Sequence, residues 1–227
     1  MARRISRKQL KHDEFVEAAF DFGHWLEENS MLVLKWVAGV VLVALAIVVW
    51  QFNARQNRRE RAELLAQGMQ QYEQAEEQSF EDPAVLQQAL GTFDEVSESA
   101  GGSATGQVAR FYRGAALFRL GRLDEATAAL EEVAGSSSAP PTLGGTAQAL
   151  LARVHVAAGR PDQAVSLLTA ELERSDPLIP EDQALLELGR IHEDAGRPGQ
   201  AREAWQRILD DLPQSAAAIE ARQLLGS

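Results

Sequence analysis

Hydrophobic residues form one uninterrupted run near the start of the chain and recur at regular intervals after it. The run, Met31 to Trp50, has twenty residues and one charge, Lys35, in a sequence that is otherwise polar. About 20 apolar residues in a helix match a bilayer hydrocarbon core of roughly 30 Å. The pattern therefore predicts a membrane-spanning helix at residues 31–52, with the lysine stem running back to the headgroups.

Residues 1–30 carry two different patterns. Five basic residues lie in the first eleven positions, and they fit either contact with anionic lipid or a solvated tail. Apolar residues of 13–28 recur at helical spacing opposite acidic ones. This spacing predicts an amphipathic juxtamembrane helix that rests on the bilayer or on a partner membrane protein.

The segment after the run favours a continued helix. Residues 53–78 contain no proline, one glycine and many good helix formers, so we expect a helical stalk over 53–80. Asp82 and Pro83 then fit an N-cap and the first turn of a new helix.

Beyond the stalk, amphipathic stretches come in pairs with a regular period. Each pair is joined at a Gly-Arg dipeptide, and the three glycines stand 38 and 37 residues apart: Gly121, Gly159 and Gly196. The second stretches begin near Asp124, Pro161 and Pro198. Glycine suits a left-handed helix end and proline suits a first helical turn, so the pattern predicts three helix–turn–helix repeats.

Small residues recur where the paired helices would cross. The first helices place Gly114, Ala152 and Gly189 there, and the second helices place Ala126, Ala164 and Ala201. Large apolar residues follow at Leu130, Leu168 and Trp205. A repeat-terminal proline stands at Pro213, Pro177 comes one residue late, and the first repeat has no equivalent. This order resembles the tetratricopeptide repeat family, whose unit is about 34 residues of helix–turn–helix.

The resemblance implies an all-α protein: a single N-terminal transmembrane helix followed by a right-handed tetratricopeptide-type α-solenoid. We expect the solenoid over 62–227, with clear repeats at 107–140, 145–178 and 182–213. Residues 62–99 are expected to form a degenerate preceding pair, and 215–225 a helix that covers the last apolar face.

In the resembled family, the first helix of each pair lines a concave groove that binds extended peptides. The equivalent positions here are Val108, Phe111, Phe118, Arg119, Ala149, Arg153, Val156, Leu186, Arg190 and Glu193. An apolar floor with three arginines would suit a protein segment that bears a carboxylate. The same arginines could instead pair with acidic residues inside the array.

Composition and motifs argue against several classes of function. From Ala62 onward, 12 Lys and Arg stand against 26 Asp and Glu, which argues against nucleic acid as a partner. The chain has no cysteine, and it contains no nucleophile-elbow, zincin or phosphate-loop motif. His155 and His192 lie one repeat period apart, too far for a shared metal, and are interpreted as packing residues. We therefore predict a non-enzymatic binding protein without metal or cofactor.

The order of basic arm, span and repeats further resembles the YfgM-type ancillary subunits of the Sec translocon in the bacterial inner membrane. That resemblance implies a single-pass protein with a cytoplasmic N-terminus and a periplasmic repeat domain that contacts chaperones, exported chains or the translocon. The flanking charges oppose this orientation, because Arg55, Arg58, Arg59 and Arg61 follow the span while Lys11 alone lies near its start. A cytoplasm-facing recruiter of soluble partners and a self-associating assembly protein remain open alternatives.

Overall fold

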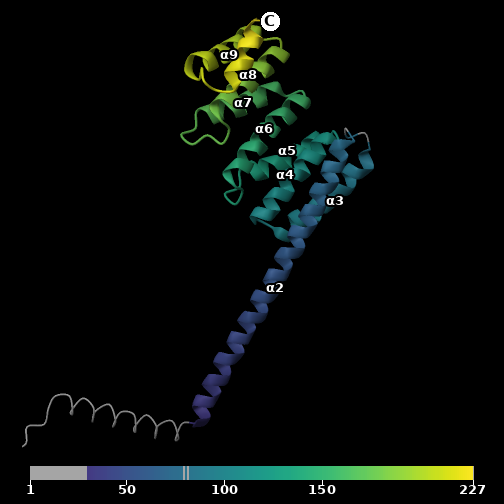
Figure 1. The fold of residues 1–227 in the computed structure, drawn as a ribbon, viewed down its shortest axis with the longest axis vertical. Helices are drawn as coiled ribbons and strands as arrows, with labels where there is room; N and C mark the ends of the chain where they lie inside the picture. Colours follow the sequence, from purple (N-terminus) through teal and green to yellow (C-terminus); the bar gives the residue numbers. More distant parts are fainter. Residues whose placement is uncertain (1–29, 79, 81, 227) are drawn as a thin grey trace, which may run out of the picture. The chain divides into compact units, whose positions relative to one another are not determined.

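The computed structural model describes residues 30–78, 80 and 82–226, and its chain divides into two compact units, Met1–Arg58 and Arg59–Ser227 (Figure 1). The predictions for the basic tail and the juxtamembrane helix lie outside these described residues, apart from Ser30. Every regular element of the described part is an α-helix, as predicted from the apolar periodicity.

The first unit contains the beginning of α2 (Ser30–Glu77). This helix includes an 18-residue window with a mean hydropathy of 2.2, and none of the window is buried. Large apolar side chains such as Val40, Leu45 and Trp50 are 65%, 55% and 71% exposed. By length and composition, the segment is able to cross a membrane.

The described residues of the second unit form the rest of α2 and eight further helices. Their bounds are α3 (Pro83–Ala100), α4 (Ala104–Arg119), α5 (Leu123–Ala134), α6 (Pro141–Ala157), α7 (Pro161–Leu172), α8 (Glu181–Asp194), α9 (Pro198–Asp211) and α10 (Ala217–Gly226). The predicted cap of α3 is present, because the Asp82 side chain accepts a hydrogen bond from the Ala84 backbone N–H at 2.9 Å.

Three helix pairs, α4–α5, α6–α7 and α8–α9, share one turn geometry. Gly121, Gly159 and Gly196 have φ values of 72°, 71° and 71°. In each turn the arginine after the glycine donates its backbone N–H to the carbonyl five residues earlier, as Arg160 does to His155 at 2.8 Å. This is the Schellman arrangement, which needs a left-handed residue that glycine adopts without steric cost. The predicted glycine turns are confirmed.

The small residues lie where the paired helices cross. Ala126, Ala152 and Ala164 are fully buried. A Cβ on Gly114 would lie 2.8 Å from Cγ of Leu130, so α4 and α5 approach too closely for a larger residue. Neighbouring pairs stack on one another in chain order, which gives the second unit a continuous helical core (Figure 1).

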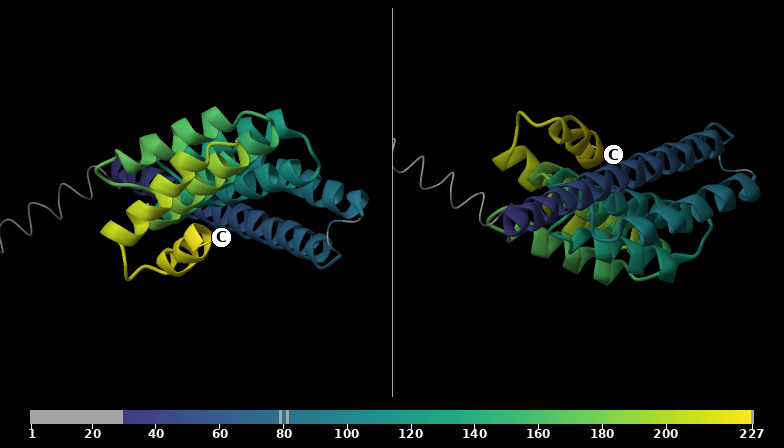
Figure 2. Two further views of the ribbon diagram at one scale, coloured as in Figure 1. Left: turned by 90° about the horizontal axis from the view of Figure 1, so that it is seen from above. Right: turned by 90° about the horizontal axis from the view of Figure 1, so that it is seen from below.

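Helices outside the three pairs close both ends of this array. Gly68 of α2 lies against the ring of Phe93 in α3, and Thr92 donates to Gln71 at 3.1 Å. At the other end, α10 packs on α8 and α9 (Figure 2) and buries Ala218 and Ala221 against the apolar side of the last pair. Such a closing helix keeps the last apolar face of a solenoid out of water.

Candidate peptide-binding groove

Two neighbouring hollows lie along the first helices of the repeats. The larger hollow, of about 670 Å³, lies between α6 and α8, and the smaller one, of about 270 Å³, lies between α2, α4 and α6. Phe118, Ala149 and Arg153 line both. The two hollows therefore form one surface, here called the groove.

Eight of the ten residues predicted for the groove line one or both hollows. They are Phe111, Phe118, Arg119, Ala149, Arg153, Val156, Leu186 and Arg190. Val108 and Glu193 line neither hollow. Val108 lies one helical turn before Phe111, and Glu193, an exposed residue, follows Arg190 by three positions on the same face of α8.

The hollows exist because side-chain size varies along the groove. The first helix of the first repeat presents Phe118, and that of the third presents Leu186, whereas α6 presents Ala149 between them. Ala149 is half-buried against the core cluster below. A small residue between larger ones leaves a depression with an apolar floor, which suits the side chains of an extended segment.

The three groove arginines have different surroundings. Arg190 donates to Glu187 of its own helix at 3.1 Å and is also paired with Glu220 of α10. The hydrogen bond that Arg190 donates to the Glu220 carboxylate is the main reason that the pKa of Arg190 lies above its usual value. Its charge is therefore already neutralised within the protein.

Arg119 is held by aromatic rings. Its guanidinium carbon lies 4.5 Å from the centre of the Phe80 ring, a cation–π contact. It also hydrogen-bonds to Tyr72; burial raises the pKa of that phenol, and Arg119 partly offsets the effect. Arg119 thus forms part of the wall of the smaller hollow.

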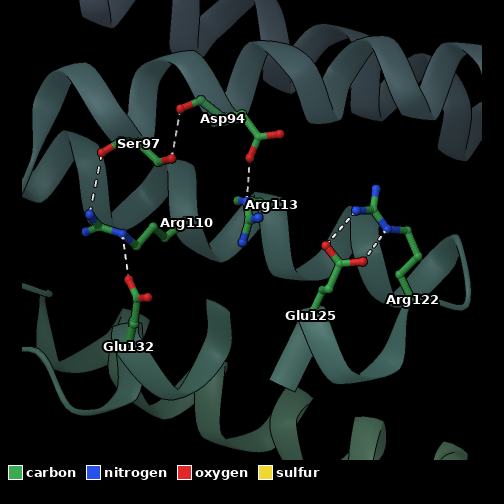
Figure 3. A network of polar contacts seen from close by, with 7 residues as sticks. All are labelled: Asp94, Ser97, Arg110, Arg113, Arg122, Glu125 and Glu132. Carbon is green, nitrogen blue, oxygen red and sulfur yellow. Dashed lines mark hydrogen bonds and ion pairs between the residues drawn. The ribbon is translucent and has the colours of Figure 1, made fainter. Parts of the chain in front are cut away.

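Arg153 has no hydrogen bond, ion pair or ring contact with any residue that the structure describes. This contrasts with two arginines of α4 that line neither hollow (Figure 3): Arg110 binds Glu132 at 2.9 Å and Arg113 pairs with Asp94. Arg122 likewise forms a two-point contact with Glu125, at 2.7 and 2.6 Å. Of the groove arginines, Arg153 is the one without an ion-pair or ring partner among the described residues.

The repeat histidines are buried packing residues. His155 and His192 are 7% and 8% exposed, and their Nδ1 atoms have no hydrogen-bond partner among the residues that the structure describes. Burial lowers the pKa of both imidazoles, and the neighbouring Arg160 and Arg197 lower it further. The described residues contain no cluster of three His, Asp or Glu able to hold a metal ion.

Several other residues that line the hollows were not predicted from the sequence. Tyr72, Thr146 and Leu150 line the smaller hollow, and Ile179, Gln183, Glu187 and Asp194 are among those that line the larger one. Tyr72 belongs to the degenerate first pair, where no repeat position could be assigned. Gln183, Glu187 and Asp194 share a helical face with Arg190, and this spacing could have identified them.

Comparisons with known proteins agree with this architecture. A model of the tetratricopeptide repeat-like domain matches residues 23–225. No curated protein matches the chain.

Similar solved structures also consist of such repeats. A kinesin light chain protein of Podosopora anserina with nearly identical TPR-like repeats is 19% identical, with a TM-score of 0.51, over 71% of this chain and 84% of that one. A variant of that protein gives the same identity and coverage with a TM-score of 0.50. YrrB, a TPR protein with an unusual peptide-binding site, is 18% identical with a TM-score of 0.30, over 61% of this chain and 84% of that one. With the family model matched over nearly all of the helical array, the chain belongs to the tetratricopeptide repeat-like domain family.

Proposed function

We propose that the protein is a membrane-anchored interaction scaffold that holds a segment of a partner protein in the groove. The observation that carries this proposal is the apolar groove across α4, α6 and α8, with the unpaired Arg153 on its wall. Repeat solenoids use such surfaces for binding rather than catalysis.

The apolar part of α2 supports the anchor. Its exposed Val, Leu and Trp side chains would be costly to leave in water, and a bilayer would cover them. We propose that this segment spans the inner membrane of a bacterium, with the N-terminus in the cytoplasm and the repeats in the periplasm. In that setting the scaffold would assist chaperones or exported chains at the Sec translocon, as the resemblance to YfgM-type subunits implies.

One observation favours a second candidate, a cytoplasm-facing recruiter of soluble partners. Arg55, Arg58 and Arg59 follow the apolar segment and are exposed. Positive residues beside a span favour the cytoplasmic side. Protease added to intact spheroplasts separates the two orientations: digestion of the repeats supports the periplasmic one, and protection supports the recruiter.

The scaffold function itself is tested by site-specific photo-crosslinking in cells. A photoreactive residue replaces Val156, which is half-buried in the larger hollow, and in a control it replaces Arg202, an exposed residue of α9 outside both hollows. We expect adducts with other proteins from position 156 and few from 202. If the chain forms adducts only with other copies of itself, the result favours self-assembly instead. If positions 156 and 202 give the same adducts, the result contradicts binding of a partner in the groove.

A further inference from the structure

Resting on the proposed function, we infer that the groove selects an internal acidic residue of an extended segment, flanked on both sides by large apolar residues. The acidic side chain pairs with Arg153, and its apolar neighbours occupy the two hollows. This specificity follows from three features of the groove: the unpaired charge of Arg153, the apolar walls beside it, and the presence of a hollow on each side of it.

The first feature is the distribution of free charge. Of the charged groups that line the larger hollow, Arg190 pairs with Glu187 and Glu220, whereas Asp194 and Arg153 have no ion-pair partner among the described residues. In the smaller hollow, Arg119 is held over Phe80. Arg153 lines both hollows and has no partner among the described residues, so an incoming carboxylate meets a cation that needs no other bond to be broken first.

The second feature is the apolar surroundings of that cation. Phe118, Ala149 and Val156 line the larger hollow beside Arg153. A bound segment would cover this surface and exclude water, which strengthens a guanidinium–carboxylate pair. A ligand without an acid would leave the guanidinium desolvated and unpaired, which is unfavourable. Arg153 therefore contributes selectivity as well as attraction.

The third feature is that apolar space lies on both sides of Arg153. A segment that ended in a carboxylate at this point would fill one hollow and leave the other empty. A side-chain carboxylate within a longer segment lets the chain continue in both directions. The two-sided groove therefore favours an internal Asp or Glu over a chain terminus.

The probe is an array of nine-residue peptides with amidated ends. Each peptide has Glu, Gln or Lys at the central position and Leu or Phe two, three or four positions away on both sides. Binding to the purified full-length chain in detergent is measured by fluorescence anisotropy. We expect at least one spacing at which the Glu peptide binds roughly tenfold or more tightly than the Gln peptide.

Charge reversal identifies the residue responsible. Arg153→Glu should weaken binding of the Glu peptide by at least the same factor, and the variant should bind the Lys peptide most tightly. Arg202→Glu is the matched control, because Arg202 is exposed, has no partner among the described residues and lines neither hollow. The control should leave the Glu preference unchanged, so that a general effect of net charge is excluded.

Several results would overturn the inference. Equal binding of Glu and Gln peptides, an unchanged preference in Arg153→Glu, or no binding by any peptide would each do so. A second array with free carboxyl ends tests the terminal alternative, and exclusive binding of those peptides would also contradict an internal acid. The scaffold function would survive these failures if position 156 still formed adducts with other proteins in cells, and would fall with them if it did not.

Discussion

The indole ring of Trp205 in α9 occupies the space that a Cβ atom on Gly189 in α8 would need. The indole N–H also donates to the Leu186 carbonyl at 3.4 Å, and Trp205 is only 3% exposed. In the last repeat, the large side chain of Trp205 therefore packs against Gly189, a residue with no side chain. The close approach of α8 and α9 depends on this match.

Gly189→Ala should lower the free energy of unfolding by about 1–3 kcal/mol, because the rigid indole must move. Gly91→Ala is the matched control, since a Cβ there meets nothing within 4 Å and alanine favours the helix. Urea unfolding of the full-length chain, followed by helical circular dichroism, measures both. If Gly189→Ala is as stable as the wild type, α8 and α9 accommodate the added methyl group without loss of stability, and the prediction is wrong.

The two repeat histidines predict a pH dependence of stability. Because burial holds the pKa of His155 and His192 below the value in the unfolded chain, near 6.5, protons bind the unfolded state first as pH falls. Stability is therefore full above about pH 6.5 and decreases as pH falls below it. The charged groups that also influence these rings are Arg160 and Glu131 at the first, and Arg197, Asp162 and Glu203 at the second.

The double variant His155→Phe, His192→Phe removes both titrating groups. Its free energy of unfolding should change less between pH 7 and pH 5.5 than that of the wild type, as measured by urea unfolding at each pH. Parallel pH profiles for the two proteins would contradict the assignment of these histidines as buried neutral groups.

Much of the fold could be predicted from the sequence because its signals are local. The left-handed glycines at 121, 159 and 196, the proline at the start of α7 and the small residues at the helix crossings each reflect a backbone or packing requirement within one repeat. Repetition of these signals at a fixed period made the helix pairs predictable.

A hydrogen bond to the side chain of Glu171 connects α7 to the loop that follows it. Its carboxylate is 2% exposed, accepts the backbone N–H of Leu178 and lies 3.5 Å from Arg174. Glu171→Ala should destabilise the protein by about 1–3 kcal/mol and expose that N–H, whereas Glu171→Gln keeps an acceptor and should cost less. Hydrogen exchange at Leu178 measures the effect, and unchanged protection in the alanine variant would disprove the connection.

The state of the groove arginines could not be predicted because it depends on contacts between distant positions. Arg190 and Glu220 lie 30 residues apart, and nothing in the spacing of α8 and α10 indicates that they meet. Arg119 stacks on Phe80 from outside its own repeat. The sequence indicated three equivalent arginines, whereas the structure distinguishes a paired, a stacked and a free one.

Glu220→Gln should release part of Arg190's charge into the groove. The pair is about half exposed, so its loss should change the free energy of unfolding by less than about 1 kcal/mol. Peptides with a second acidic residue should gain several-fold in affinity, and peptides with one acid should change little. Anisotropy titrations measure this, and equal gains for both peptide classes would argue against a specific role for Arg190.

The central claim is that a partner protein is held in the groove, and filling its floor tests this most directly. Ala149→Leu adds bulk between the two hollows without changing charge, and Ala170→Leu adds the same bulk at an exposed position of α7 outside both. Adducts with other proteins from a photoreactive residue at position 156 should fall about tenfold or more in Ala149→Leu and stay unchanged in Ala170→Leu, with equal helicity in both. Undiminished adducts in Ala149→Leu would show that partners bind elsewhere on the molecule.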